Sequence, residues 1–200
     1  MKSKKTVGLI IFIVIAAAAV LGIYYYLMNR PADSTDMVEV TETGELSSMD
    51  IMADYPASPR AVVDLYSRYM ACLYNEEYTD EDFKTLITKM RLVMDDELLS
   101  VNPEDSYYEA MLLDVTDYKN KNWTIANYTI PDSDEVTYKD IDGQSMALLT
   151  VSYFIKENTS YAKSYQNYIL RKDSSGLWKI YGYSLKGTQD VDENGNAING

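Results

Sequence analysis

The first hydrophobic feature of the chain is an apolar run close to its start. The residues from Val7 to Met28 carry no charge. A helix of these 22 residues rises about 33 Å, which is enough to cross the roughly 30 Å hydrocarbon core of a bilayer. We therefore predict one transmembrane helix over residues 7–28, with the lipid bilayer as its partner.

Charge on either side of this run predicts its orientation. Residues 1–6 contain three lysines, whereas the next Lys or Arg after Arg30 is Arg60. Because positively charged flanks stay in the cytoplasm, we expect residues 1–6 to form a cytoplasmic tip of a single-pass protein of the cell membrane. The rest of the chain is then extracytoplasmic. A cleaved signal peptide ending near Ala18 is the alternative, although the apolar run continues well past that site.

Polar segments flank the remaining sequence. Residues 29–54 are acidic and rich in Ser and Thr, which predicts a flexible linker, with docking of the stretch 46–52 onto the domain as the alternative. Residues 188–200 are expected to form a disordered polar tail. Within it, Asp190 to Asn196 resembles the first half of a calcium loop, but the chain ends before the bidentate Glu that such a loop needs. We therefore place the extracytoplasmic domain at residues 55–187.

The first part of this domain has the apolar periodicity of helices. We expect helices that start at Ser58, Thr79 and Asn102, because each of these residues can cap a first turn. Apolar residues then recur every three or four positions as far as residues 73, 98 and 118, respectively. The pattern predicts three amphipathic helices, each with one face to bury.

Strand patterns follow from residue 123 onward. Alternating apolar and polar residues, together with β-branched or aromatic residues, predict five strands. They cover residues 123–130, 135–139, 145–156, 161–172 and 177–186. Asp142 and Gly143 are typical of a tight hairpin turn. Because helices come first and an antiparallel meander second, we predict an α+β fold. Three helices would pack on a curved antiparallel sheet of about five strands.

Composition narrows the possible chemistry. The chain has 18 Lys and Arg against 31 Asp and Glu, a net charge of −13, which argues against nucleic acid as a partner. It has no His and one Cys, so a Ser-His-Asp triad, an internal disulfide and a Cys/His zinc site are excluded. We predict no catalytic residue, no metal and no cofactor.

The closing strand and the capped helices resemble a known family. Gly176-Leu177-Trp178-Lys179-Ile180 after a hairpin meander is similar to the cone-shaped fold of nuclear transport factor 2 and the ketosteroid isomerases. Ser58-Pro59-Arg60 and the stretch 72–81 resemble, within that superfamily, an uncharacterised family of single-pass, membrane-anchored bacterial proteins. The resemblance covers residues 55–186 and implies the fold without an activity. The catalytic Asp and Tyr of the isomerases cannot be transferred, since no motif fixes which residues here would face a cavity.

Aromatic residues supply the ligand-binding candidates. The chain has 19 tyrosines, and Tyr66, Tyr69, Tyr153 and Trp178 can line a cavity and stack on a ring or a sugar. The alternative is ordinary packing, because Tyr suits half-buried strands and helix faces.

We predict a membrane-anchored, extracytoplasmic binding or interaction module that is not an enzyme. Its partner would be an unknown protein or small-molecule ligand. One alternative is a structural subunit of a membrane-bound secretion or conjugation assembly. Another is a small-molecule isomerase or hydrolase that uses a carboxylate and a Tyr in the cone cavity, which requires a buried carboxylate with a raised pKa.

Overall fold

The computed structural model describes residues 41–198. The predicted cytoplasmic tip, the predicted transmembrane helix and the first part of the predicted linker lie outside the described residues. Within residues 41–198, none of the helices has the length and apolar character that crossing a bilayer requires.

Five α-helices lie in the described part of the chain, where the sequence predicted three. They are α2 (Glu42–Ser48), α3 (Pro59–Asn75), α4 (Asp80–Arg91), α5 (Asp96–Val101) and α6 (Glu104–Asn120). Two of the three predicted caps are present: Ser58 accepts from the backbone of Ala61, and Thr79 and Asp82 form a capping box, whereas Asn102 ends α5 and does not cap the next helix. Helix α6 begins after Pro103 without a side-chain cap.

The second predicted helix is split because its middle pairs with the sheet. The sequence predicted one helix as far as residue 98, but α4 ends at Arg91. Val93 then accepts a backbone hydrogen bond from Ile180 at 2.8 Å, and Asp95 donates one back to Ile180 at 2.9 Å. Asp95 next caps α5 by accepting from the backbone N–H of Glu97. Tertiary backbone pairing therefore overrides the helical periodicity here.

The segment before α3 belongs to the folded unit, which begins at Thr41 rather than at Tyr55. Helix α2 lies inside the stretch predicted as flexible linker, and the side chains of Leu46 and Ile51 are buried in the core. The hydroxyl of Tyr69 donates to the backbone oxygen of Leu46 at 3.0 Å. This is the docking that the alternative interpretation of residues 46–52 allowed, and it corrects the linker prediction from residue 41 onward.

The five strands form one antiparallel sheet. They are β1 (Trp123–Thr129), β2 (Thr137–Ile141), β3 (Gln144–Glu157), β4 (Ser160–Lys172) and β5 (Trp178–Val191). The order is β1-β3-β4-β5, and β2 pairs with the opposite end of the β3 edge that β1 uses. Asp142 and Gly143 turn the β2–β3 hairpin with φ of 53° and 79°. The predicted α+β class and antiparallel five-stranded sheet are thus confirmed.

The chain end is more ordered than predicted. Strand β5 continues to Val191, whose side chain is buried. The chain then turns back: the backbone N–H of Asp192 donates to Asn196 at 2.8 Å, and Val191 and Ala197 form a β-bridge. The expected disordered tail is therefore corrected for residues 188–198.

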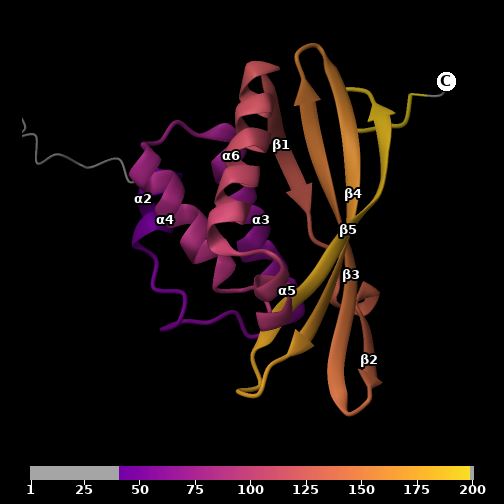
Figure 1. Ribbon diagram of the computed structural model, residues 1–200. Coiled ribbons are helices and arrows are strands. Elements are labelled where there is room, and N and C mark those ends of the chain that lie inside the picture. Colours follow the sequence, from indigo (N-terminus) through magenta and orange to yellow (C-terminus); the bar gives the residue numbers. More distant parts are fainter. Residues whose placement is uncertain (1–40, 199–200) are drawn as a thin grey trace, which may run out of the picture. The chain divides into compact units, whose positions relative to one another are not determined.

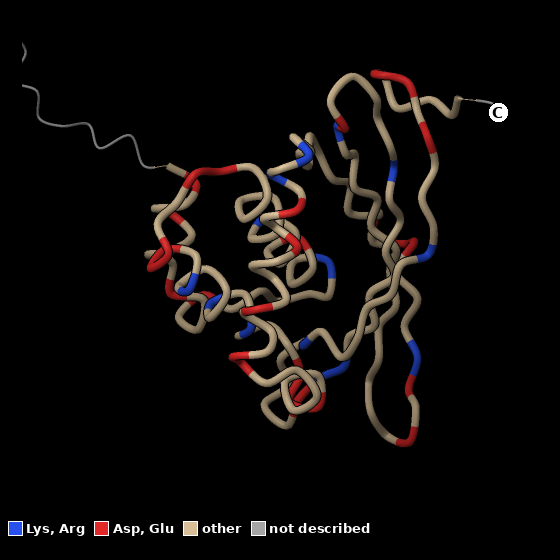
Figure 2. Tube along the Cα trace, turned by 45° about the horizontal axis from the view of Figure 1, so that its top comes forward, with Lys and Arg blue, Asp and Glu red and all other residues tan. Residues whose placement is uncertain are grey.

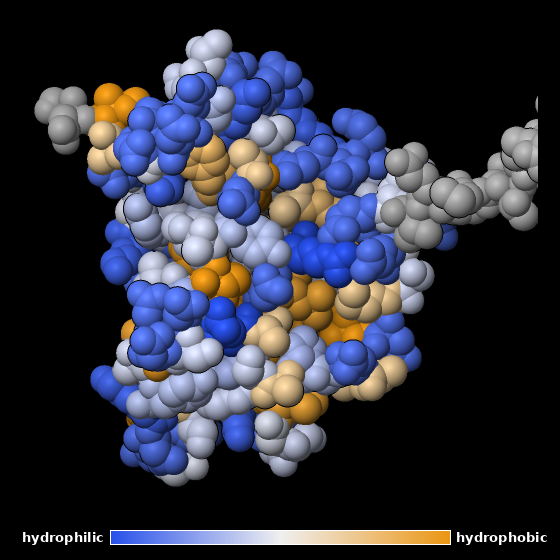
Figure 3. Space-filling model, turned by 180° about the vertical axis from the view of Figure 1, so that it is seen from behind, coloured by the Kyte–Doolittle hydropathy of each residue, from blue (hydrophilic) through white to orange (hydrophobic). Residues whose placement is uncertain are grey.

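The helices lie on one face of the sheet, and the β2–β3 hairpin extends beyond them (Figure 1). The inward residues of β3 alternate along the strand and bury Ala147, Leu149, Val151, Tyr153 and Ile155. Acidic residues gather at helix starts and loops, where they complement the helix dipoles and remain in water (Figure 2). Seen from behind, the surface is mostly hydrophilic with separate apolar patches (Figure 3).

The docking of α2 can be tested by truncating its buried leucine. We expect Leu46→Ala to lower the free energy of unfolding by about 2–5 kcal/mol, because it leaves a cavity at a fully buried site. Met52→Ala, at a side chain that is 54% exposed, should change it by less than about 0.5 kcal/mol. Urea denaturation followed by circular dichroism measures both. Equal, small effects would mean that α2 does not pack on the domain.

Candidate functional site

A pocket of about 240 Å³ lies between the helices and the inner face of the sheet. We call it the helix–sheet pocket. Its walls come from α3, α6, β1, β3 and β4, and its lining consists of Met70, Tyr74, Asp114, Tyr118, Ile125, Tyr153, Ile155, Ser164 and Gln166. Segments far apart in sequence thus meet around one hollow.

Local geometry explains why these side chains face the same space. Met70 and Tyr74 are four residues apart on α3, and Asp114 and Tyr118 have the same spacing on α6, so each pair shares a helix face. Ser164 lies two residues before Gln166 on β4, so both point to the same side of the sheet. One face of α3, one face of α6 and the inward side of β4 therefore all border the helix–sheet pocket.

A chain of hydroxyl groups runs from the pocket into the core. The hydroxyl of Tyr153 lies 2.7 Å from that of Ser67 and 2.7 Å from that of Tyr168, and Tyr168 donates to Oε1 of Gln166 at 3.1 Å. Burial raises the pKa of both Tyr153 and Tyr168 above the usual value of a phenol. These tyrosines therefore stay neutral at physiological pH and act as hydrogen-bond donors or acceptors.

The rim of the pocket carries a carboxylate and two aromatic rings. Tyr74 donates its hydroxyl hydrogen to Asp114, and burial, reinforced by that carboxylate, raises the pKa of Tyr74 well above its usual value. The rings of Tyr74 and Tyr118 meet edge to face with centres 4.6 Å apart. The pocket thus combines flat apolar walls with a hydroxyl, an amide and a carboxylate.

Two of the four predicted ligand-binding residues lie close to one another. Tyr153 lines the helix–sheet pocket. Tyr66 is buried deeper, and its ring lies 5.8 Å from that of Tyr168, which is hydrogen-bonded to Tyr153. Tyr168 therefore connects the two predicted residues.

The other two predicted residues lie elsewhere in the fold. The hydroxyl of Tyr69 holds α2 through the backbone oxygen of Leu46. Trp178 begins β5, where its ring lies 6.0 Å from that of Tyr138 and its carbonyl accepts a hydrogen bond from Tyr55 at 2.8 Å. The structure does not bring these two side chains together with Tyr153.

Sequence reasoning missed the polar residues of β4. Side chains that are two, four or six residues apart on a strand point to the same face of the sheet. The positions that share the inward face with buried Leu170 include Ser164, Gln166 and Tyr168. A run of hydrogen-bonding side chains on the core side of a strand is a signal that could have been noticed. Asp114 gave no such signal, because it is an exposed residue of a helix with a weak apolar pattern.

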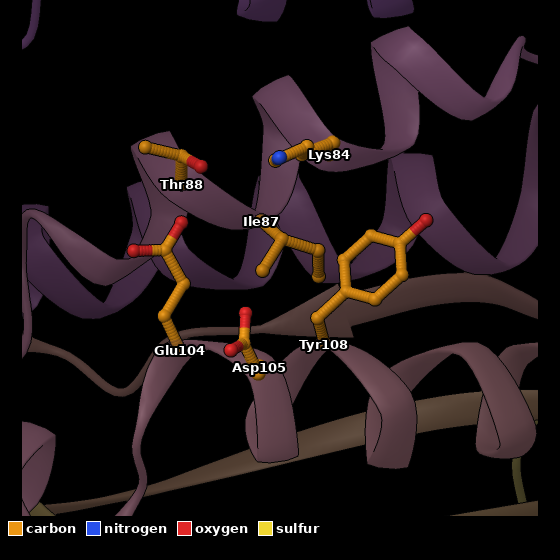
Figure 4. Close-up of a pocket in the computed structure, with 6 residues that line it drawn as sticks. All are labelled: Lys84, Ile87, Thr88, Glu104, Asp105 and Tyr108. Atoms are coloured by element: carbon orange, nitrogen blue, oxygen red, sulfur yellow. The ribbon is translucent and has the colours of Figure 1, made fainter.

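A second pocket, of about 290 Å³, separates α4 from α6 (Figure 4). Ile87 extends from α4 into the gap, flanked by Lys84 and Thr88, and Glu104, Asp105 and Tyr108 rise toward it from α6. The charged side chains of this groove are exposed. In residues 41–198 no three acidic or Cys side chains lie close enough to hold a metal ion.

The isomerase alternative needs a buried carboxylate in the cavity. Among the described residues the buried carboxylate is Asp95, which is 3% exposed and lies at the start of α5. Arg171 holds it with two hydrogen bonds of 2.8 and 2.7 Å, so this acid has a structural partner outside the pocket. The carboxylate of the pocket itself, Asp114, is exposed at the rim.

Comparison with known proteins adds a family but no activity. The model of a protein family described as a domain of unknown function, DUF6715, matches residues 1–183. This span includes every residue that lines the helix–sheet pocket. No curated protein matches the sequence.

The buried phenols predict a loss of stability at alkaline pH. Burial raises the pKa of Tyr69 and of Tyr118 to about 12, against about 10 in an unfolded chain. Their contribution is therefore complete below about pH 10 and is lost as pH rises through the raised values. The free energy of unfolding should fall above about pH 10, and tyrosinate absorbance should appear in two phases, the later one with unfolding. A single phase near pH 10 in the still-folded protein would contradict this.

Proposed function

This chain belongs to the family described as the domain of unknown function DUF6715, and we propose that it is a membrane-anchored extracytoplasmic module that binds a small polar ligand. The helix–sheet pocket is the proposed site. The observation that carries the proposal is the convergence of neutral hydrogen-bonding groups, an exposed carboxylate and aromatic walls on one hollow. Small-molecule sites typically combine apolar walls with a few polar groups that fix orientation.

The size of the pocket limits the ligand. Drug-sized ligands usually occupy about 300–1,000 Å³, whereas this pocket has about 240 Å³. We therefore propose a ligand with about one ring, such as a sugar or a small aromatic molecule. Tyr74 and Tyr118 would stack on it, and Ser164 and Gln166 would hydrogen-bond to its polar edge.

The architecture supports the finer assignment to a nuclear transport factor 2-like fold. Helices cover one face of an antiparallel sheet with strands of up to 14 residues, as in the cone-shaped proteins that the sequence resembles. In such a cone the helix–sheet pocket would be the cavity between helix layer and sheet.

The proposal of a membrane anchor is based on the sequence of residues 7–28. Their uncharged character and the lysines before them support an uncleaved helix with the N-terminus in the cytoplasm. A domain held outside the membrane in this way would meet ligands or partners at the cell surface.

Ligand binding can be tested at Ser164, a pocket residue whose side chain is 7% exposed. A library of sugars and small aromatic molecules would be screened by thermal shift on the wild-type protein. For any molecule that stabilises it, Ser164→Leu should lower affinity at least about tenfold, because the larger side chain fills the pocket and removes a hydroxyl. Ser184→Leu, at an exposed position of β5, is the matched control. Equal affinities in the two variants would exclude this pocket.

Membrane topology can be tested by cysteine labelling in intact cells. The native Cys72 is buried, and burial raises the pKa of its thiol, so it should react little. A membrane-impermeant maleimide should label Ser184→Cys in intact cells and label Ser3→Cys only after lysis. Labelling of both, or of neither, before lysis would contradict the proposed orientation.

A further inference from the structure

The charge that borders the helix–sheet pocket is negative. Asp114 is the charged residue of its lining, which contains no Lys or Arg. Oδ2 of Asp114 accepts a hydrogen bond from the hydroxyl of Tyr74. Within residues 41–198, no other side-chain donor binds this carboxylate, and no Lys or Arg forms an ion pair with it. Oδ1 and the negative charge are therefore available to a ligand.

The lysines that follow Asp114 in sequence are held elsewhere. Nζ of Lys119, near the end of α6, donates to the backbone oxygen of Glu76 at 2.6 Å. Nζ of Lys121, just after the helix, pairs with Asp117 at 2.6 Å. Both cations thus have partners of their own, and neither neutralises the carboxylate at the rim of the pocket.

A second carboxylate adds to the negative potential at this rim. Burial, followed by the charges of Asp114 and Glu157, raises the pKa of Tyr118 to about 12. Glu157 is the last residue of β3, and Tyr118 lines the pocket. The net charge of the whole chain, −13, has the same sign. A cleft bordered by one sign of charge concentrates ions of the opposite sign, so this pocket favours a cation.

The walls of the pocket suit an organic cation. The rings of Tyr74 and Tyr118 meet at 67° with centres 4.6 Å apart, and Tyr153 adds a third ring to the lining. The face of an aromatic ring is electron-rich and attracts an ammonium group that lies within about 6 Å of its centre. Aromatic rings beside a carboxylate that has no cationic partner are the features that recognise an amine.

We propose that the ligand of the helix–sheet pocket carries a protonated amine, as an amino sugar or an aromatic amine does. This inference rests on the proposed function, because it names the chemical class of the ligand of the same pocket. The ammonium group lies between Asp114 and the ring of Tyr118, and Ser164 and Gln166 hold the rest of the molecule. An ammonium group has only donors, and the carboxylate offers it both an acceptor and the opposite charge.

Matched pairs of probes separate the effect of charge from that of shape. Benzylamine would be compared with benzyl alcohol, and glucosamine with glucose, by calorimetric titration of the purified full-length chain at a slightly acidic pH that keeps both amines protonated. In at least one pair the amine should bind at least about tenfold more tightly than its neutral partner. The pair that shows this preference distinguishes an aromatic amine from an amino sugar. Added sodium chloride should weaken the preference, because salt screens the attraction.

Variants on α6 locate the groups responsible. Asp114→Asn should remove the preference for the amine, because it keeps the shape of the side chain and deletes its charge. Glu109→Gln is the matched control, since it deletes an exposed charge of the same helix outside the pocket and should keep the preference. Tyr118→Leu should bind the amine at least about threefold more weakly than Tyr118→Phe, which retains the face of the ring.

Three results would overturn the inference. The first is an amine that binds no more tightly than its neutral partner in both pairs, which includes a protein that binds none of the four probes. The second is a preference that survives Asp114→Asn, and the third is equal affinity of the two Tyr118 variants for the amine. The library screen with Ser164→Leu decides the proposed function separately: a neutral ligand that this variant fails to bind would support the pocket while the present inference fails.

Discussion

The folded unit depends on one physical constraint, which is that a buried phenol must find a hydrogen-bond partner. Tyr69 meets this need at the backbone of α2, and Tyr55 meets it at the first residue of β5. Tyr153 joins α3 to β4 through Ser67 and Tyr168. The bonds of Tyr55 with Trp178 and of Tyr153 with Ser67 join the helical side of the chain to the sheet, and the bond of Tyr69 joins α2 to α3. The tyrosines thus fix the helical layer on the sheet with a geometry that apolar packing alone would leave loose.

The same constraint shapes the proposed ligand site. In the helix–sheet pocket, the hydroxyl chain from Ser67 ends at Gln166, where polar side chains line an open space. Because burial keeps the phenols of this hydroxyl chain protonated, they can orient a ligand by hydrogen bonding.

One buried ion pair complements the phenols. Arg171 on β4 binds both carboxylate oxygens of Asp95 and also contacts Glu97. Asp95 is at once the cap of α5 and part of the short stretch that pairs with β5. This explains why the chain leaves helical geometry after Arg91 although its apolar periodicity continues: the backbone pairing and the ion pair together outweigh helix propensity.

The sequence by itself determined the α+β class, the five strands, the hairpin at Asp142 and the helix starts at Ser58 and Thr79, because these depend on local periodicity, capping and turn chemistry. It also indicated that aromatic residues are candidates for lining a cavity, but not which of them lie close together in the fold. Only the tertiary structure decided that α2 docks, that the second predicted helix breaks and that Ser164 and Asp114 face one pocket with Tyr153. The reason is that these outcomes follow from pairing between distant segments, whose geometry no local pattern encodes.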